Sequence, residues 1–320
     1  MALAIKVEVL SAIGWNPEKW GDRATHDFTG CVLGRTQLHN SCTAARQPLH
    51  IQELLAPELI SLEAYFAPKN SHNRCNMTIP ALILAAGRGQ RMRPLTDSTP
   101  KPLLQVRGRA LIDWQVQALA DGGFTRLVIN TDWLGPQIPA YFEHQIDVEP
   151  NKYGCKQLSI SYSHEGVDFG AALETAGGVA RALPLLGDVF WVLAGDVFTP
   201  GFAFTQSAVD RFSASGNLAH LWLVPNPAHN VKGDFGLSAD GQALNVPVGS
   251  EQARFTFSTI ALYRQAFFDA LPFGNPDGVK APLAPLLRAA MDNHHVSAEL
   301  YLGEWTDVGT PERLAELNQT

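Results

Sequence analysis

Between residues 77 and 224, short hydrophobic runs alternate with longer segments in which hydrophobic positions recur every three to four residues. The runs predict strands and the longer segments predict helices. The expected strands are residues 80–85, 126–130, 158–163, 189–193 and 218–224, and the expected helices are residues 111–120, 135–143, 175–183 and 204–215. Several strands, such as VFWVL at 189–193, are hydrophobic throughout, which is typical of a parallel sheet covered on both faces. The pattern predicts an α/β fold with a doubly wound, mostly parallel mixed sheet.

The pattern changes after residue 225. Short strands are expected at 232–237 and 242–248, on either side of the turn sequence Ala239-Asp240-Gly241. A longer β-rich run at 254–263, a helix at 281–291, a strand at 298–302 and a final helix at 311–317 follow. This part predicts a small β-rich region beside the main sheet.

Residues 1–76 differ from the rest of the chain. They contain three of the four cysteines, show weak periodicity, and carry seven basic and seven acidic residues, so the whole net charge of -7 belongs to residues 77–320. We expect Met77 to be the natural start and residues 1–76 to be an extension that is poorly ordered or not native. A small accessory domain is the alternative. Residues 77–320 are expected to form the functional domain.

Composition excludes several classes of function. Basic residues do not cluster outside one loop, so we expect no nucleic-acid partner. No hydrophobic run reaches the roughly 18 residues of a membrane span, and Lys6 and Glu8 interrupt the hydrophobic N-terminus, which makes it a poor secretory signal. The four cysteines show no metal-binding spacing and predict free thiols. We therefore expect a cytoplasmic protein.

One stretch, residues 81–104 (ALILAAGRGQRMRPLTDSTPKPLL), carries the clearest chemistry. It begins as a buried strand and continues as a loop with two glycines and four cations, and its three prolines prevent a long helix. The glycines are Gly87 and Gly89, the cations Arg88, Arg91, Arg93 and Lys101, and the prolines Pro94, Pro100 and Pro102. Backbone N–H groups beside glycines reach phosphate oxygens, and cations neutralise them, so the loop predicts a triphosphate site.

Other interpretations of the loop fail. A dinucleotide-binding fingerprint requires a third glycine where Met92 stands and a helix that Pro94 obstructs. A P-loop would end in GK[ST], which is absent. Elsewhere, the pair His294-His295 has no third ligand at a suitable spacing and is expected to be solvated.

The order G-x-G-x-R, P-x-T and P-K-P in this loop resembles the signature of the sugar-1-phosphate nucleotidyltransferases. The resemblance continues through LETAGG (173–178), GDV (195–197) and WTDVGT (305–310), and covers about residues 78–318. Within the family, the chain is most similar to the short bacterial N-acetylmuramate α-1-phosphate uridylyltransferases of cell-wall recycling. The motifs that indicate this subgroup are LETAGG, KGDF (232–235), FTFS (255–258) and APLLR (284–288).

The resemblance implies a nucleotidyltransferase domain over residues 77–320. A sugar phosphate oxygen would attack the α-phosphorus of a nucleoside triphosphate, and pyrophosphate would leave. Lys101 is the expected cation at the α-phosphate and Arg91 the expected cation at the β- and γ-phosphates. Surface roles are as plausible as binding roles for Arg88 and Arg93. The resemblance also implies one Mg²⁺ held by Asp196 and Asp307, which are far apart in sequence.

The remaining site residues come from the same resemblance. The expected nucleotide-binding residues are Leu84, Ala85, Ala86, Gly87, Gly89, Gln90, Arg91, Lys101 and Gly177, and the expected sugar-phosphate-binding residues are Asp234, Glu174 and Ser258. Asn130 is either a pocket residue or a turn residue. The subgroup often has Asn two positions before the metal aspartate, where this chain has Ala194, which weakens the assignment of the acceptor sugar.

The favoured substrates are UTP and N-acetylmuramate 1-phosphate. The alternatives are GTP with mannose 1-phosphate, and UTP or dTTP with glucose 1-phosphate. An inactive nucleotide-sugar-binding regulatory subunit is the alternative from another class, although such proteins usually lose the cation or the metal aspartates. No C-terminal assembly domain is recognisable, so a monomer is expected.

Overall fold

The structure is a computed structural model that describes residues 79–148, 152–154 and 158–319. The expectation for residues 1–76 lies outside these described residues. The described fold is built on one sheet of nine strands.

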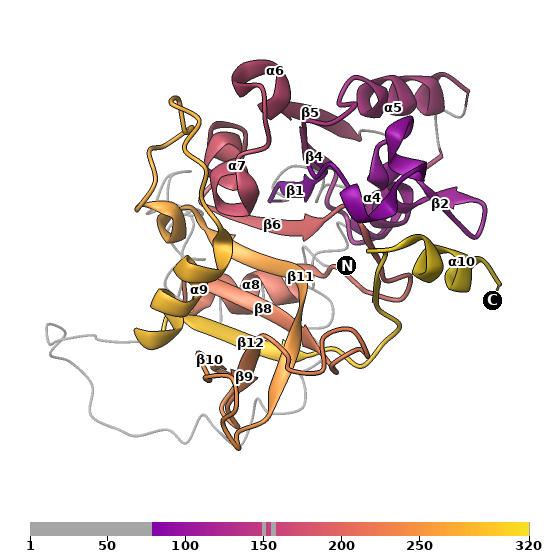
Figure 1. Cartoon of the computed structure of the whole chain (residues 1–320). Helices are drawn as coiled ribbons and strands as arrows, with labels where there is room; N and C mark the ends of the chain where they lie inside the picture. Colours follow the sequence, from indigo (N-terminus) through magenta and orange to yellow (C-terminus); the bar gives the residue numbers. More distant parts are fainter. Residues whose placement is uncertain (1–78, 149–151, 155–157, 320) are drawn as a thin grey trace, which may run out of the picture. The chain divides into compact units, whose positions relative to one another are not determined.

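The centre of the sheet is parallel. Strand β1 (Ala81–Leu84) pairs with β4 (Arg126–Thr131) on one side and with β6 (Val189–Ala194) on the other, and β5 (Ser159–His164) extends the sheet beyond β4. Leu84 lies opposite both Asn130 and Ala194. Three strands therefore end at the same edge of the sheet (Figure 1).

The other strands make the sheet mixed. Strand β11 (Arg254–Arg264) is antiparallel to β6, to β8 (Ala219–Val224) and to β9 (Phe235–Leu237). Strand β12 (Val296–Leu300) runs parallel to β8, and β10 (Ala243–Leu244) pairs with β9. The predicted α/β fold, with a mixed sheet and a small β-rich region, is confirmed.

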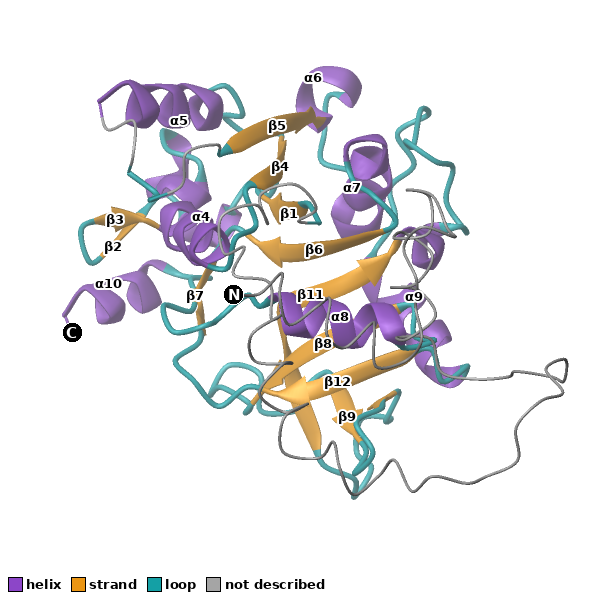
Figure 2. Cartoon of the chain, turned by 180° about the vertical axis from the view of Figure 1, so that it is seen from behind, coloured by secondary structure: helices purple, strands orange, loops and turns teal. Residues whose placement is uncertain are grey.

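Helices cover both faces of the sheet. Helices α4 (Leu111–Asp121), α5 (Gln137–Val148) and α8 (Gln206–Ala214) pack with Ala81 and Ile83 of β1. Helices α7 (Glu174–Ala182) and α9 (Leu283–Asp292) pack with Leu82 on the opposite face (Figures 1 and 2). Because both faces of β1 are buried, its sequence is hydrophobic without alternation. None of the helices in the described part of the chain is long and apolar enough to cross a membrane.

The loop after β1 consists of three short 3-10 turns, η3 (Gln90–Met92), η4 (Leu95–Asp97) and η5 (Lys101–Leu103). No long helix forms between residues 85 and 104, as the prolines predicted. The hairpin β2 (Gln105–Val106) and β3 (Arg109–Ala110) follows. Helix α10 (Pro311–Gln319) packs on this region through a small cluster that contains Met92, Leu314 and Leu317.

A few elements were not expected from the sequence. They are α6 (Glu165–Phe169), η6 (Leu183–Leu185), η7 (Gln265–Phe268), and the two-residue strands β2, β3, β7 (Val197–Phe198) and β13 (Thr306–Asp307). Two residues are too few to show a period, so local sequence cannot reveal strands of this length.

Candidate active site

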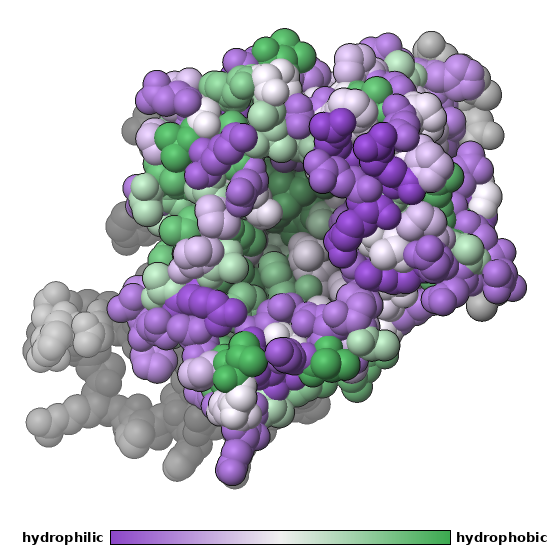
Figure 3. Space-filling view, in the orientation of Figure 1, coloured by the Kyte–Doolittle hydropathy of each residue, from purple (hydrophilic) through white to green (hydrophobic). Residues whose placement is uncertain are grey.

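A cavity of about 240 Å³ lies at the edge where β1, β4 and β6 end. Figure 3 shows this face hollowed at its centre, with hydrophobic residues on the floor of the hollow. The residues that line the cavity are Leu84, Ala85, Ala86, Gly87, Lys101, Pro102, Asn130, Glu165, Ala172, Glu174, Thr175, Ala194 and Asp196. The cavity lies where doubly wound folds bind ligands, and the strands before Gly87 and Asp196 open into it, as the sequence predicted.

A buried polar network supports one wall of the cavity. Asn130 accepts a hydrogen bond from the N–H of Ala85 (2.6 Å) and donates one to Glu165 Oε1 (2.6 Å). Glu165 Oε2 accepts the N–H of Leu173 (2.7 Å). Burial raises the pKa of the Glu165 carboxyl group, and the hydrogen bonds from Leu173 and Asn130 oppose that rise. Sequence reasoning missed Glu165, although it directly follows β5 and so stands at the carboxyl edge of the sheet.

Gly178 of α7 makes room for this network. A Cβ atom there would lie 2.5 Å from Glu165 Oε1 and 3.0 Å from Asn130 Nδ2. We predict that Gly178→Ala lowers the free energy of unfolding by about 1–3 kcal/mol because of this overpacking, although alanine is normally the better helix former. Urea denaturation measures the change. Gly187→Ala is the control because its Cβ would meet no atom within 4 Å, and a Gly178 variant as stable as this control would contradict the prediction.

The loop that follows β1 and contains Gly87 and Gly89, called the glycine loop here, has backbone N–H groups without a partner among the described residues. The N–H groups of residues 87–89 bond to no other residue that the structure describes, and a Cβ at Gly87 would meet nothing within 4 Å. Gly89 has a φ of 63°, which favours glycine, and its carbonyl accepts the Thr96 hydroxyl (2.8 Å). The loop is thus fixed from within while the N–H groups stay available for an anion.

The four loop cations have different surroundings. Arg88 stacks over Trp133, with 4.3 Å from its Cζ atom to the ring centre. Arg93 pairs with Asp97 (2.6 Å) at the surface. Arg91 is exposed and makes no ion pair or hydrogen bond through its side chain within the described part of the chain. Lys101 is 7% exposed and forms an ion pair with Asp196 in the cavity wall.

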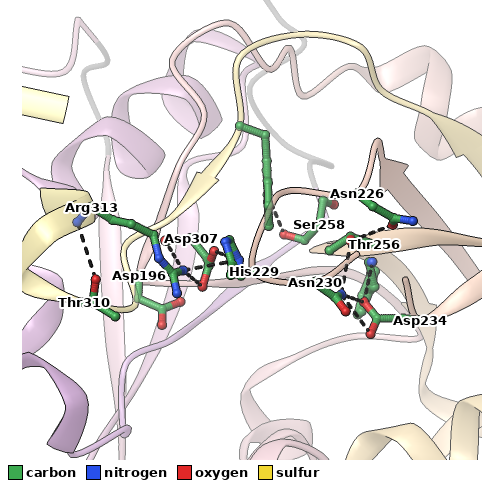
Figure 4. Close-up of polar contacts among 12 residues, drawn as sticks. Asp196, Asn226, His229, Asn230, Asp234, Thr256, Ser258, Asp307, Thr310 and Arg313 are labelled. Atoms are coloured by element: carbon green, nitrogen blue, oxygen red, sulfur yellow. Dashed lines mark hydrogen bonds and ion pairs between the residues drawn. The ribbon is translucent and has the colours of Figure 1, made fainter. Parts of the chain in front are cut away.

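Asp196 and Asp307, which are distant in sequence, are brought together by a two-stranded ribbon. Asp307 of β13 lies opposite Val197 of β7, and the N–H of Val308 donates to the carbonyl of Asp196 (2.9 Å). Figure 4 shows the two aspartates beside each other. The spacing in the sequence gave no sign of this contact.

Two further basic residues, which sequence reasoning missed, contact Asp307. Arg313 of α10 donates to Asp307 Oδ2 (2.5 Å), and His229 Nε2 lies 2.6 Å from Oδ1. The sequence offers one indication that Arg313 belongs to the site, its position three residues after the WTDVGT motif. No feature of the sequence indicates the role of His229.

The two aspartates fit one Mg²⁺. Within the described residues, no three His, Cys, Asp or Glu side chains form a metal-binding group. Magnesium, however, needs only one or two carboxylates, with phosphate and water oxygens completing its shell. Asp307 Oδ1 is buried and accepts no well-oriented hydrogen bond from the described residues, although His229 Nε2 lies 2.6 Å from it. Two neighbouring carboxylates are the kind of ligand that this ion takes.

The remaining predicted site residues divide into two groups. Leu84, Ala85, Ala86 and Glu174 line the cavity together with Gly87, Lys101 and Asp196, whereas Gly177, Asp234 and Ser258 are not among its lining residues. Gln90 is exposed at the start of η3.

Three predicted residues are bonded within the protein. The N–H of Gly177 donates to the carbonyl of Ala281 (3.1 Å). Ser258 is fully buried, and its hydroxyl donates to the carbonyl of Trp222 (2.6 Å). The carboxylate of Asp234 accepts the N–H of Phe257 (2.9 Å). A Cβ at Gly177 would lie 2.5 Å from the carbonyl oxygen of Val279, so close packing between segments explains this glycine.

Comparisons with known proteins agree with this geometry. The sequence model of the nucleotidyl transferase family matches residues 80–248. The chain is 46% identical over 242 residues to the N-acetylmuramate alpha-1-phosphate uridylyltransferase of Neisseria meningitidis serogroup B, a match that covers 74% of this chain and 95% of that protein. It is 30% identical over 241 residues to the enzyme of the same name from Caulobacter vibrioides, covering 72% and 92%.

Solved structures show the same fold. A crystal structure of a candidate glucose-1-phosphate thymidylyltransferase from Bacillus anthracis, in complex with a sucrose, superposes with a TM-score of 0.61. The two share 20% sequence identity, and the superposition covers 76% of this chain and 94% of that one. With the family match over more than half of the chain, the resemblance seen in the glycine loop is confirmed: this chain is an enzyme of the nucleotidyl transferase family.

Proposed function

We propose that the enzyme transfers a uridylyl group from UTP to N-acetylmuramate 1-phosphate, giving UDP-N-acetylmuramate and pyrophosphate. The observation that carries the proposal is the Lys101–Asp196 ion pair in the cavity wall, next to a loop whose N–H groups at residues 87–89 have no partner in the described part of the chain. The substrates are proposed from the 46% identity to the Neisseria meningitidis enzyme.

The reaction joins two anions, so alignment and charge neutralisation carry the catalysis. An oxygen of the sugar phosphate forms a bond to the α-phosphorus, the bond from that phosphorus to the bridging oxygen breaks, and pyrophosphate leaves with the electron pair. Lys101 is the proposed cation at the α-phosphate. Arg91, whose side chain has no partner within the described residues, would turn to the β- and γ-phosphates, and Gly87 to Gln90 would donate backbone hydrogen bonds.

Asp196 and Asp307 are the proposed ligands of one Mg²⁺. When bound, the ion would supply positive charge to the phosphate oxygens of both substrates. Lys101 would hold Asp196 in place, and the β7–β13 ribbon would fix the separation of the two carboxylates.

The acceptor sugar is proposed to lie between Glu174, which lines the cavity, and Asp234. Ser258 was the third sugar-binding candidate. Because its hydroxyl is already bonded to Trp222 and to the N–H of Ile260 (3.1 Å), its contribution would be to support the strand beneath the sugar. Ala194 lines the cavity with a methyl group, so an amide contact at that position is not available to the sugar.

A substrate screen tests the proposal. The purified chain is incubated with each of four nucleoside triphosphates and with N-acetylmuramate, mannose or glucose 1-phosphate, and pyrophosphate release is measured with Mg²⁺ or with EDTA. We expect the fastest turnover for UTP with N-acetylmuramate 1-phosphate, and none in EDTA. No turnover of this pair would rule out the proposed substrates. GTP with mannose 1-phosphate, or UTP or dTTP with glucose 1-phosphate, would then take their place, and no turnover of any pair would favour a regulatory subunit.

We also propose that residues 77–320 form the catalytic domain and that the enzyme acts as a monomer in the cytoplasm. The family match that begins at residue 80 supports the domain boundary. A chain that starts at Met77 should keep the full rate of pyrophosphate release.

A further inference from the structure

The two basic side chains on Asp307 come from outside the glycine loop. Arg313 Nη1 donates to Asp307 Oδ2 (2.5 Å) and to the carbonyl of Asp307 (3.0 Å). His229 belongs to the segment between β8 and β9, and its Nε2 lies 2.6 Å from Asp307 Oδ1 and 3.3 Å from Arg313 Nη1. Figure 4 shows these three side chains meeting beside Asp196. Asp307 is thus flanked by a pair of basic side chains that do not belong to the loop.

Part of the Arg313 guanidinium forms no hydrogen bond with the residues that the structure describes. All of its side-chain contacts with other described residues go through Nη1, which leaves the N–H groups of Nε and Nη2 without a partner there. A guanidinium presents its N–H groups in a planar fork that matches two phosphate oxygens at once. Arg313 can therefore hold Asp307 and still bind an anion.

Gly309 makes this placement of Arg313 possible. A Cβ atom at Gly309 would lie 2.9 Å from Arg313 Nη1 and 3.0 Å from Asp307 Oδ2. Any other residue would push the guanidinium away from the carboxylate. The glycine in the WTDVGT segment therefore makes room for the arginine four residues later.

A basic group at this position suits the charges of the reaction. The sugar 1-phosphate is a second anion that must approach the α-phosphate of the nucleotide, and two anions repel each other unless cations lie between them. Among the described residues, the basic side chains that form ion pairs with the aspartate pair are Lys101 on Asp196, and His229 and Arg313 on Asp307. Lys101 is assigned to the nucleotide, so the other two remain for the acceptor.

We propose that Arg313 and His229 bind the phosphate group of the sugar 1-phosphate. This inference rests on the proposed function and adds residues that it does not include. Both side chains are partly exposed, His229 by 35% and Arg313 by 16%, so an anion can reach them.

The segment that carries His229 also indicates how the sugar 1-phosphate would be oriented in the site. Asn230 donates to both Asp234 Oδ2 (3.2 Å) and Thr256 Oγ1 (3.1 Å), which fixes the segment to β11. His229, near the middle of this segment, lies against Asp307, and Asp234 stands at the end of the segment, next to β9. With its phosphate on His229 and Arg313, the acceptor would extend its sugar ring toward Asp234.

The test separates phosphate binding from the orientation of Asp307. Initial rates are measured for Arg313→Met, His229→Ala and Gly309→Ala, with UTP and N-acetylmuramate 1-phosphate varied in turn. We expect the KM for the sugar phosphate to rise about tenfold or more, which is the value of one charge-assisted hydrogen bond, while the KM for UTP stays within about twofold. Arg313→Lys keeps the charge but not the fork and should recover part of the loss. Arg211→Met is the control. It removes an arginine of helix α8 that pairs with Glu299 of β12, and it should change neither KM.

Calorimetry with inorganic phosphate, without metal, gives a second measurement that does not depend on turnover. The unmodified enzyme should bind phosphate more tightly than Arg313→Met. Equal phosphate binding by the two proteins, or a fall in kcat with an unchanged KM for the sugar phosphate, would show that Arg313 and His229 only orient Asp307 and would overturn the inference. If the unmodified enzyme turns over no sugar phosphate at all, the proposed function fails, and phosphate binding still decides whether the subsite exists.

Discussion

Replacing Lys101 by Met is expected to lower kcat about 10²- to 10³-fold, the usual effect of removing one preorganised group that stabilises charge in a transition state. Lys101 is the only loop cation that is buried and in contact with a cavity carboxylate, Asp196, among the residues described. Methionine fills a similar volume beside Gly89, where the lysine side chain packs, so the loop should keep its shape. Pyrophosphate release under saturating substrates measures the effect.

Arg93→Met is the matched control for this prediction. It removes a cation from the same loop, but Arg93 is exposed and paired with Asp97 at the surface. We expect its kcat to stay within about twofold of the unmodified enzyme, because exposed ion pairs contribute little. Equal urea midpoints for both variants would show that folding is intact. If Lys101→Met keeps its kcat, Lys101 is not the cation at the reacting phosphate.

Asp113→Ala is expected to lower the free energy of unfolding by about 3–5 kcal/mol, which is typical when one partner of a buried charge network is removed. Asp113 of α4 is fully buried. It accepts hydrogen bonds from the hydroxyl groups of Tyr141 (2.7 Å) and Tyr153 (2.6 Å) and pairs with Lys152. Burial raises the pKa of both tyrosine hydroxyls, so they stay protonated and continue to donate. The alanine variant would leave the hydroxyl groups of the buried Tyr153 and the half-buried Tyr141 without this acceptor and would remove the ion-pair partner of Lys152.

Urea denaturation followed by far-UV circular dichroism measures this loss. Asp121→Ala on the same helix is the control, because Asp121 is exposed and its side chain accepts a single hydrogen bond from the residues that the structure describes, from Gln117 (2.8 Å). We expect the control to change stability by no more than about 0.5 kcal/mol. An Asp113 variant as stable as the Asp121 variant would mean that Tyr141, Tyr153 and Lys152 find other partners after the change.

The sequence predicted the parallel centre of the sheet because that information is local. Strands β1, β4 and β6 contain hydrophobic runs, β5 alternates polar and apolar residues, and the chain places a helix between one strand and the next. The strand ends were predicted at residues 85 and 193, where hydrophobic runs give way to glycine, and β1 and β6 end within one residue of these positions, at Leu84 and Ala194. Hence part of the cavity wall, from Leu84 to Gly87 and at Asp196, could be named in advance.

Contacts between distant segments could not be predicted in this way. The pairing of Asp307 with Val197, and the approach of His229 to Asp307, depend on how the whole chain returns to the sheet edge. Gly177 illustrates a second limit. The sequence alone does not show whether a small residue at the start of a helix makes room for a ligand or for a neighbouring segment. At Gly177 a neighbouring segment, at Val279 and Ala281, lies against the glycine.

The β7–β13 ribbon has a consequence for local unfolding. The ribbon is a two-stranded sheet of its own, separate from the nine-stranded sheet. Opening of the ribbon alone would therefore part Asp196 from Asp307 while the strands of the main sheet stay paired. The two carboxylates would lose their fixed separation before the fold as a whole is lost.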